Sequence, residues 1–177
     1  MGKKSIVRSL LRQKLLPAEV HQKADELFKV CIARYFNTAP MVGLYCALPD
    51  EVRLTWEGPC FVPVGMECRL WSEDQSPGQY GVMVPNTGIC QVPAGSVVAV
   101  PGLAFCSDGK RLGRGQGYYD RFLAQHSNLV RLGIAYGIDV YDWPSETHDV
   151  IMDALIDVQS EKIFFFEDRL KERGLLL

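Results

Sequence analysis

The segment "SVVAVPGLAF" (residues 96–105) has the composition of a strand in the centre of a sheet. Its β-branched and apolar residues run on without alternation, as expected where both faces of a strand are covered. A short turn leads to "GKRLGRGQGYYDR" (109–121), in which three glycines alternate with an arginine and a glutamine. Helical character then begins at "YYDRFLAQH" (118–126). This order predicts that the glycine-rich loop lies at the carboxyl end of a central strand, where open α/β sheets bind ligands.

Helix and strand candidates alternate around this segment. Apolar residues recur at helical spacing over residues 3–16 and 20–35, and a last short helix is expected to end at Gly174. The pattern predicts an α/β fold: a single domain over residues 1–177, with an open, mostly parallel, Rossmann-like sheet flanked by helices on both faces. The further strand candidates are residues 41–48, 61–64, 68–71, 80–84, 131–138, 154–158 and 162–166.

The composition is that of an ordinary globular protein. Apolar residues make up 47% of the 177 residues and charged residues 23%, and the net charge of −2 gives no basic field for nucleic acid or membrane. No apolar run approaches the roughly 18 residues that span a bilayer. The six cysteines form no C-x-x-C pair, so a zinc site is not expected. Because the chain is long and residues 1–16 lack the apolar region of a signal peptide, reduced thiols and a cytoplasmic location are expected.

The glycine-rich loop has the features of a phosphate site. Glycines let backbone N–H groups approach a ligand, and a helix N-terminus adds partial positive charge. Lys110, Arg111 and Arg114 add full charges. Asp120 falls near the first helical turn, where a carboxylate would repel phosphates unless a Mg²⁺ ion lay between them. The loop therefore predicts a phosphate site with a metal ion.

The spacing leaves two other interpretations open. The loop lacks the G-x-x-x-x-G-K-[ST] pattern of a Walker A motif, but Gly113, Gly115 and Gly117 approximate a dinucleotide fingerprint, with Tyr118 in the place of the third glycine. Asp139 is loosely placed to be the acidic residue of such a site, as in a dinucleotide oxidoreductase. The remaining interpretation is a glycine-rich turn with solvated charges.

A longer match narrows these interpretations. The segment "VPGLAFCSDGKRLGRGQGYYDRFL" (100–123) closely resembles the signature of the 5-formyltetrahydrofolate cyclo-ligase family, also called 5,10-methenyltetrahydrofolate synthetase. Weaker resemblances follow in chain order: "KSIVR" (4–8), "LPDEV" (48–52), "GQYGV" (78–82) and "HDVIMDALI" (148–156). The resemblance implies a ligase of one-carbon metabolism that converts 5-formyltetrahydrofolate to 5,10-methenyltetrahydrofolate with ATP and Mg²⁺.

The resemblance also implies roles for individual residues. Arg114 and Tyr118 take the catalytic positions. The implied ATP-binding residues are Lys4, Arg8, Arg111, Leu112, Gly113, Arg114, Gly115, Gln116, Gly117, Tyr118 and Tyr119. The implied folate-binding residues are Arg8, Cys46, Glu51, Arg114, Gly115, Gln116, Gly117 and Tyr118. The implied metal ligands are Asp120 and Asp149, with Asp153 as the competitor of Asp149.

The chain departs from the family pattern at a few positions. Cys106 stands where the family usually has an aspartate after "GLAF", and Val84 stands where an acidic residue usually precedes the mid-chain proline. These departures motivate an alternative hypothesis, a non-catalytic regulator that binds nucleotide or folate on the same fold. Under either hypothesis the chain is expected to be a monomer that takes a small reduced folate and neither nucleic acid nor membrane as its partner.

Overall fold

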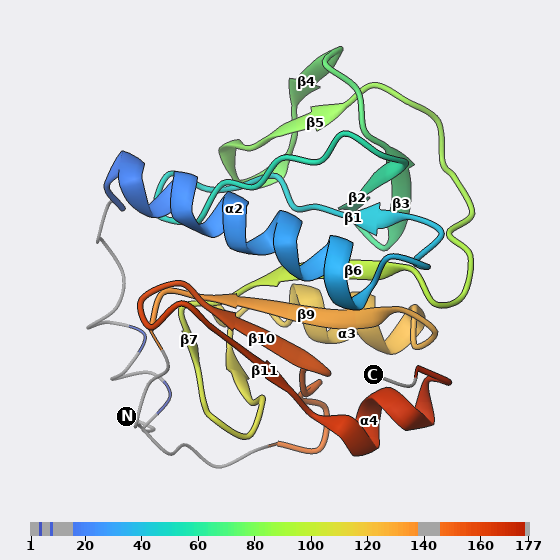
Figure 1. The fold of residues 1–177 in the computed structure, drawn as a ribbon. Coiled ribbons are helices and arrows are strands. Elements are labelled where there is room, and N and C mark those ends of the chain that lie inside the picture. Colours follow the sequence, from blue (N-terminus) through green and yellow to red (C-terminus); the bar gives the residue numbers. More distant parts are fainter. Residues whose placement is uncertain (1–3, 5–7, 9–15, 138–145, 176–177) are drawn as a thin grey trace.

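The fold is built around one large sheet (Figure 1). The computed structural model describes residues 4, 8, 16–137 and 146–175. Of the helix expected over residues 3–16, Lys4 and Arg8 are described and both are helical, whereas the apolar stripe of that helix lies outside the described residues. The elements in chain order are α2 (Ala18–Tyr35), β1 (Val42–Gly43), β2 (Cys60–Val64), β3 (Glu67–Leu70), β4 (Gln75–Pro77), the 3₁₀ helix η1 (Gln79–Gly81), β5 (Met83–Pro85), β6 (Val97–Pro101), β7 (Ala104–Phe105), β8 (Arg111–Leu112), α3 (Tyr118–Gln125), β9 (Val130–Ala135), β10 (Ala154–Asp157), β11 (Lys162–Phe165) and α4 (Glu167–Glu172).

The large sheet has seven strands in the order β11-β10-β9-β6-β1-β2-β3. Neighbours from β10 to β2 are parallel, while the edge strands β11 and β3 run antiparallel to their partners. The mostly parallel sheet confirms the predicted α/β class. The chain proceeds from β1 to one side and from β6 to the other, so the sheet changes direction between these two strands. A crevice at such a point, beyond the carboxyl ends of the strands, is where open sheets bind ligands.

Strand β6 is buried on both faces, as its composition predicts. Val97 and Ala99 belong to the apolar cluster on one face, and Val98 and Val100 belong to the cluster on the other. All five residues of β6 are buried. Burial of this kind is possible only where helices cover both faces of a parallel sheet.

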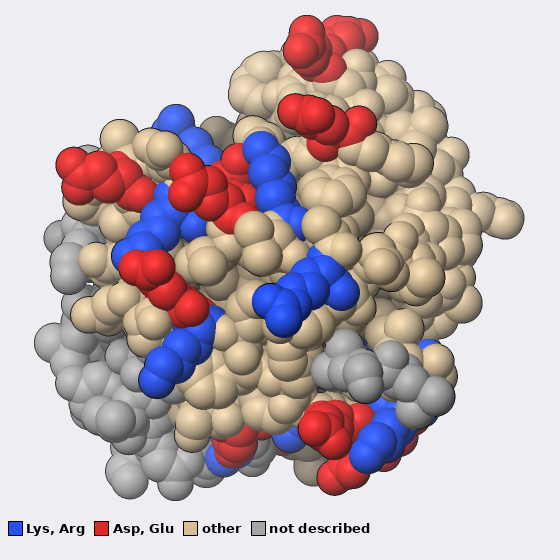
Figure 2. Space-filling model, in the orientation of Figure 1, with Lys and Arg blue, Asp and Glu red and all other residues tan. Residues whose placement is uncertain are grey.

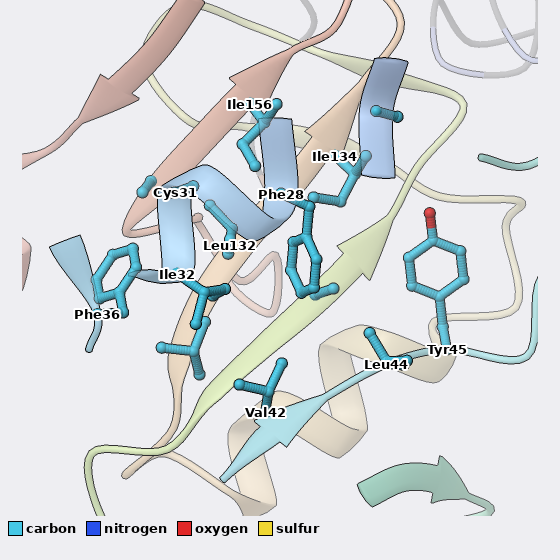
Figure 3. Packing of buried hydrophobic residues seen from close by; sticks show 14 of the residues in the cluster. Phe28, Cys31, Ile32, Phe36, Val42, Leu44, Tyr45, Leu132, Ile134 and Ile156 are labelled. Carbon is cyan, nitrogen blue, oxygen red and sulfur yellow. The ribbon is translucent and has the colours of Figure 1, made fainter. Parts of the chain in front are cut away.

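Two helices provide much of that cover. The buried residues of α2 recur at intervals of three and four, so that Phe28 and Ile32 share one side of the helix. Figure 3 shows Phe28 and Ile32 packed over the sheet beside Leu132 of β9. Helix α3 covers the opposite face, where its residues Phe122 and Leu123 are fully buried. The predicted helices on both faces are therefore present.

Three expected strands differ in extent from the observed ones. The candidate at 96–105 is divided into β6 and β7 because the chain turns at Gly102, where an added Cβ would meet the ring of Phe105 at 2.9 Å. The candidate at 80–84 becomes η1 followed by β5, since Gly81 has a positive φ of 75° that interrupts an extended strand. The candidate at 41–48 shortens to β1 at Val42–Gly43.

The surface has no dominant charge on the face that contains α2. Figure 2 shows lysine, arginine, aspartate and glutamate side chains intermixed over this face, without a continuous basic area. Within the described ranges, no helix combines the length and the apolar character needed to cross a bilayer.

Gly133 of β9 provides a test of the packing beneath β7. A Cβ at this position would lie 2.5 Å from Leu155 Cδ2 and 2.7 Å from Phe105 Cε1. Gly133→Val is therefore expected to lower the free energy of unfolding by about 2–3 kcal/mol through overpacking. Urea denaturation measures the change. Gly88→Val is the matched control, because nothing lies within 4 Å of a Cβ added at Gly88. Equal midpoints for the two variants would contradict the tight packing at Gly133.

Candidate active site

A cavity of about 630 Å³ opens at the carboxyl ends of β1 and β6. Segments from both halves of the sequence form its wall, including the glycine-rich loop and the residues after β1. The fifteen residues to which the family resemblance assigns a catalytic, ATP-binding, folate-binding or metal-binding role, without the competitor Asp153, all line it: Lys4, Arg8, Cys46, Glu51, Arg111, Leu112, Gly113, Arg114, Gly115, Gln116, Gly117, Tyr118, Tyr119, Asp120 and Asp149. The cavity thus collects residues that are separated by more than one hundred positions in the chain.

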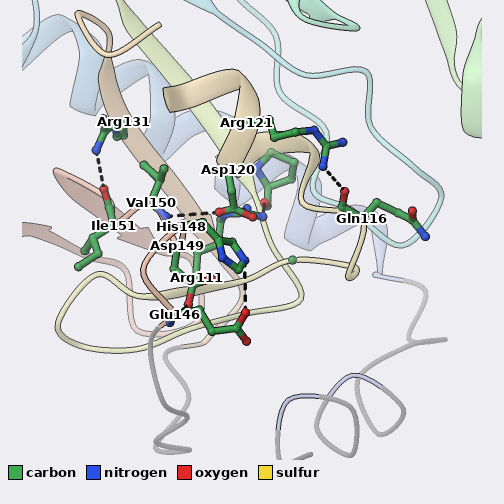
Figure 4. A network of polar contacts seen from close by, with 12 residues as sticks. Arg111, Gln116, Asp120, Arg121, Arg131, Glu146, His148, Asp149, Val150 and Ile151 are labelled. Carbon is green, nitrogen blue, oxygen red and sulfur yellow. Dashed lines mark hydrogen bonds and ion pairs between the residues drawn. The ribbon is translucent and has the colours of Figure 1, made fainter. Parts of the chain in front are cut away.

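The glycine-rich loop joins the β7–β8 hairpin to α3. Gly115 has a φ of 97° and Gly117 a φ of 60°, so both adopt the left-handed conformation that favours glycine. Gly117 is the N-cap of α3, and no side chain caps this end of the helix. The Arg121 guanidinium donates to the Gln116 carbonyl at 2.8 Å and fixes the loop against the helix (Figure 4). The N-terminus of α3 is consequently open to an anion in the cavity.

Asp120 is held by a buried arginine. Arg111 Nη2 lies 3.0 Å from Asp120 Oδ1, and only 4% of the Arg111 side chain is exposed. The Val150 amide points to the same carboxylate oxygen at 3.4 Å (Figure 4). The Arg111 guanidinium also lies over the Tyr119 ring, 5.6 Å from its centroid. These contacts place Arg111 beneath Asp120, in the wall of the cavity.

Arg114 lies opposite, between two carboxylates. Its Nη2 is 2.5 Å from Asp50 Oδ1 and its Nε is 3.2 Å from Glu51 Oε1. The Leu48 amide donates to the other Glu51 oxygen at 3.0 Å and fixes this side chain. Burial lowers the pKa of Arg114, but the hydrogen bonds and charges of Asp50 and Glu51 outweigh it and leave that pKa above its ordinary value. The arginine is therefore charged and oriented at the cavity wall.

The first-helix residues Lys4 and Arg8 reach the cavity from the other end of the chain. Lys4 Nζ lies 2.8 Å from Asp149 Oδ2 and 3.0 Å from Glu146 Oε1. Arg8 Nε donates to the Gly113 carbonyl at 2.9 Å. Burial raises the pKa of Asp149, but the Glu146 amide and the Lys4 ammonium outweigh it and hold the pKa below its ordinary value. Asp149 is therefore ionised, and its carboxylate contacts the Lys4 ammonium.

The structure separates Asp149 from its competitor Asp153. Asp153 is fully buried below the sheet edge, where its Oδ2 lies 2.6 Å from Arg173 Nε and accepts from the Arg131 amide at 2.8 Å. It does not belong to the residues that line the cavity, whereas Asp149 does. Asp153 therefore connects α4 to β9, and Asp149 is the carboxylate that faces the cavity with Asp120.

The two tyrosines of the loop differ in position. Tyr119 packs against the apolar clusters on both faces of the sheet, and burial raises its pKa well above the ordinary value. Tyr118 belongs to neither cluster and meets Tyr119 edge to face, with the ring centroids 5.0 Å apart. Tyr119 is therefore half-buried between the cavity and the two apolar clusters.

Sequence reasoning missed part of the cavity wall. Gly78, Gln79, Val82 and Val84 come from an arm formed by β4, η1 and β5 (residues 75–85, named the arm below), and Glu146 adds a further carboxylate. The resemblance at "GQYGV" was a signal for the arm. No spacing in the sequence, however, indicates that the arm and the glycine-rich loop, about thirty residues later, line the same cavity. Glu146 carried no signal apart from its proximity to Asp149.

The donors in the cavity suit a hard cation. Asp120 and Asp149 offer carboxylate oxygens, which Mg²⁺ prefers, and a Mg²⁺ ion commonly takes one or two carboxylates and completes its shell with phosphate oxygens and water. Within the described part of the chain, no three histidine, cysteine or acidic side chains gather into a complete metal site.

Comparisons with known proteins identify the family of this chain. The sequence pattern of the 5-formyltetrahydrofolate cyclo-ligase family matches residues 76–158. The 5-formyltetrahydrofolate cyclo-ligase of Mus musculus is 35% identical over an alignment of 185 positions. The alignment covers 85% of this chain and 91% of that protein. The chain belongs to this family. Two further relatives match over shorter stretches. The 5-formyltetrahydrofolate cyclo-ligase of Mycoplasma pneumoniae is 39% identical over 36% of its length, and a mitochondrial 5-formyltetrahydrofolate cyclo-ligase of Arabidopsis thaliana is 35% identical over 25% of its length.

Solved structures of the cyclo-ligase family share the fold. The 5,10-methenyltetrahydrofolate synthetase of Aquifex aeolicus superposes with a TM-score of 0.72 at 28% identity, covering 93% of each chain. The synthetase of Mycoplasma pneumoniae has a TM-score of 0.65 at 21% identity and covers 89% of this chain. The predicted family and the predicted class of enzyme, a folate cyclo-ligase, are confirmed. Asp139, on which the dinucleotide alternative depended, lies outside the described residues.

The departure from the family pattern at Cys106 lies away from the cavity. Cys106 is buried in a small apolar cluster with Ala104 and Leu112, and it is not among the described residues that line the cavity. Its amide donates to the Lys110 carbonyl at 2.9 Å, in the turn between β7 and β8. The substitution therefore removes no carboxylate from the cavity of this cyclo-ligase family member.

Cys46 allows occupation of the cavity to be measured. This half-buried thiol lines the cavity, and burial raises its pKa above the ordinary value. Alkylation of Cys46 by iodoacetamide is therefore expected to be slow at neutral pH, to accelerate as the pH rises, and to slow again when 5-formyltetrahydrofolate is added. Peptide mass spectrometry gives the rate at each thiol. Cys31, which is fully buried with a pKa of about 12, is the internal control. A rate at Cys46 that is insensitive to the folate would place the substrate elsewhere.

Proposed function

We propose that this chain catalyses the ATP- and Mg²⁺-dependent conversion of 5-formyltetrahydrofolate to 5,10-methenyltetrahydrofolate, with release of ADP and phosphate. The observation that carries the proposal is one cavity that joins an uncapped helix N-terminus, two carboxylates for a cation and an apolar wall. The first two features suit the triphosphate and its metal, and the third suits the flat rings of a folate.

The reaction explains the need for ATP. The formyl oxygen of 5-formyltetrahydrofolate is a poor leaving group, so closure of the ring does not proceed unaided. Attack of that oxygen on the γ-phosphorus forms an O–P bond and releases ADP. The N10 nitrogen then attacks the formyl carbon, and the carbon–oxygen bond breaks to release phosphate. Positioning and charge neutralisation are the main tasks that this chemistry leaves to the protein.

The phosphate end of the cavity is assigned to three groups of residues. Residues 113–119, from the glycine-rich loop and the start of α3, direct backbone N–H groups at the triphosphate. Lys4 and Arg8 add charge from the first helix, and Arg111 supports Asp120 from below. Asp120 and Asp149 would hold the Mg²⁺ ion, which when bound neutralises charge on the phosphoryl oxygens. With ATP bound, the Lys4 ammonium would exchange its partners Asp149 and Glu146 for a phosphate oxygen.

The folate end of the cavity is assigned to the opposite wall. Glu51, fixed by the Leu48 amide and Arg114, is placed to accept hydrogen bonds from the polar edge of the pterin. Cys46 forms part of the wall beside it. Arg114 lies between the two ends, where its guanidinium stabilises the charge that develops on the transferring phosphoryl group. Tyr118 closes this position from the side of α3.

A single assay tests the proposal. The protein is mixed with 5-formyltetrahydrofolate, ATP and Mg²⁺, and the near-ultraviolet absorbance of the methenyl product is followed together with ADP release. Both signals are expected to rise in equal amounts, and heat-denatured protein is the control. ATP binding without ADP release would instead favour the non-catalytic regulator. The cytoplasmic location, the monomeric state and the absence of nucleic-acid or membrane partners stay predictions.

A further inference from the structure

Two cysteines outside the candidate site face each other across a pair of antiparallel segments. Cys68 lies in the edge strand β3, and Cys90 lies in the segment between β5 and β6. An antiparallel bridge joins Arg69 to Ile89, which places Cys68 directly opposite Cys90. The Cys90 amide donates to the Cys68 carbonyl at 2.8 Å. Residues opposite each other in this way project their side chains from the same face.

The surroundings of the two side chains agree with this pairing. Cys68 is buried, with 2% of its surface exposed, and half-buried Cys90 packs against the same apolar cluster beneath α3. Opposite residues in an antiparallel pair have Cα atoms about 4.5–5.5 Å apart. Disulfides join cysteines whose Cα atoms are about 4.4–6.8 Å apart. The backbone therefore permits a bond between the two sulfur atoms without rearrangement of the strands.

The position of this pair connects it to the cavity. Cys68 and Cys90 lie just before and just after the arm, which contributes Gly78, Gln79 and Val82 to the cavity wall. In the reduced protein the base of the arm is joined to β3, among the described residues, by hydrogen bonds alone. These are the Cys90–Cys68 backbone bond beside the isolated bridge, and two side-chain bonds, from Arg69 to the Pro85 carbonyl and from Thr87 to the Leu70 carbonyl. A covalent link at this base would limit how far the arm moves from the cavity.

We propose that Cys68 and Cys90 form a reversible disulfide, a modification site that fastens the base of the arm when the protein meets a peroxide or a low-molecular-weight disulfide. The inference does not depend on the proposed function, because it rests on the pairing of the two segments.

The reaction with hydrogen peroxide balances as two thiols giving one disulfide and two waters. The Cys90 sulfur attacks one peroxide oxygen, so that an S–O bond forms, the O–O bond breaks, and a sulfenic acid and one water result. The Cys68 sulfur then attacks the Cys90 sulfur, an S–S bond forms, and the S–O bond breaks to release the second water. The peroxide receives the two electrons that the sulfur atoms lose.

The two thiols differ in reactivity in a way that sets the order of these steps. Burial raises the pKa of Cys68 to about 12 and raises that of Cys90 above its ordinary value. Since the thiolate is the reactive form, the more exposed Cys90 reacts first and both steps are slow at neutral pH. Cys68 then serves as the resolving thiol, already placed against its partner.

The experiment maps the oxidised thiols in the full-length protein. The protein is treated with hydrogen peroxide, remaining thiols are alkylated under denaturing conditions, and the digest is analysed without reduction. The expected product has lost the mass of two hydrogen atoms, contains a cross-linked peptide with Cys68 and Cys90, and regains both thiols with dithiothreitol. Its melting temperature is expected to rise by about 5 °C or more, because the link closes the loop between the two residues.

Variants separate this disulfide from other oxidations. Cys90→Ala removes a half-buried thiol and is expected to abolish both the cross-link and the thermal shift, whereas the matched control Cys31→Ala retains both. Protease cleavage within the arm is expected to be at least about threefold slower in the oxidised protein. Cross-links to another cysteine, a sulfinic acid at Cys90 without a cross-link, or six unchanged thiols after prolonged treatment would each overturn the proposal.

Discussion

Replacing Asp120 with asparagine is expected to lower the turnover of 5-formyltetrahydrofolate by about tenfold or more. The amide preserves the shape of the side chain but removes the charge that the proposed metal site requires. It also leaves the Arg111 guanidinium, whose side chain is 4% exposed, without its anionic partner. The free energy of unfolding is therefore expected to fall as well, by about 2 kcal/mol. Initial rates of methenyl formation and urea denaturation measure the two effects separately.

The control for this variant is Asp168→Asn. Asp168 is an exposed carboxylate in α4 and is not one of the described residues that line the cavity, so its replacement should leave turnover unchanged. Binding of Mn²⁺ in the presence of ATP is measured by the decrease in the electron paramagnetic resonance signal of the free ion. This binding should weaken in Asp120→Asn but not in Asp168→Asn. Normal turnover with unweakened Mn²⁺ binding would remove Asp120 from the metal site.

Replacing Arg114 with alanine is expected to reduce turnover by about 100-fold or more. The guanidinium compensates Asp50 and Glu51 at distances of 2.5 and 3.2 Å. Without it, Asp50 and Glu51 would lose their shared cationic partner, and the transferring phosphoryl group would lose the guanidinium that is proposed to stabilise it. Arg114→Lys restores the charge but not the forked geometry, so a smaller loss of about tenfold is expected. Single-turnover rates separate this loss from weaker binding.

Arg53→Ala is the matched control for Arg114. Arg53 is an exposed arginine two residues after Glu51, and its side chain is not part of the cavity wall. Its replacement should therefore change neither turnover nor the Michaelis constants. If Arg114→Ala raised the Michaelis constant for the folate and left turnover intact, Arg114 would be a binding residue and not a catalytic one.

The sequence predicted the layers of the fold better than the ends of its elements. The unbroken apolar run at 96–105 identified a central strand because two-sided burial leaves a direct compositional trace in β6. The turn at Gly102 had only a short local signal, the Pro101–Gly102 dipeptide, within an apolar run that otherwise favours a strand. The close approach of the Phe105 ring and the Arg111 stem to that glycine is a tertiary feature. Likewise, β1 ends at Gly43 although the Leu44 amide still donates to the Phe61 carbonyl, so its length depends on pairing with its neighbours in the sheet, a tertiary property.

The prediction of the site has a similar limit. Residues 111–120 are adjacent in the sequence, so their shared cavity follows from one loop. Lys4 and Arg8 could be placed with them only through the family resemblance, because no periodicity joins positions so distant. The pairing of Arg114 with Asp50 spans 64 positions, and that of Lys4 with Glu146 spans 142. Such pairs are fixed by the topology of the sheet, which local patterns do not encode.

The place of β1 in the sheet has a consequence for synthesis of the chain. Val42 of β1 pairs with Cys60 on one side and with Val97 of β6 on the other. At about 5–20 residues per second, β6 leaves the ribosome roughly 3–11 s after β1. Throughout that interval the nascent β1–β2–β3 layer has an open edge that any other extended peptide can occupy. Protection of the growing chain by a chaperone therefore matters most before the strand that precedes the glycine-rich loop has emerged.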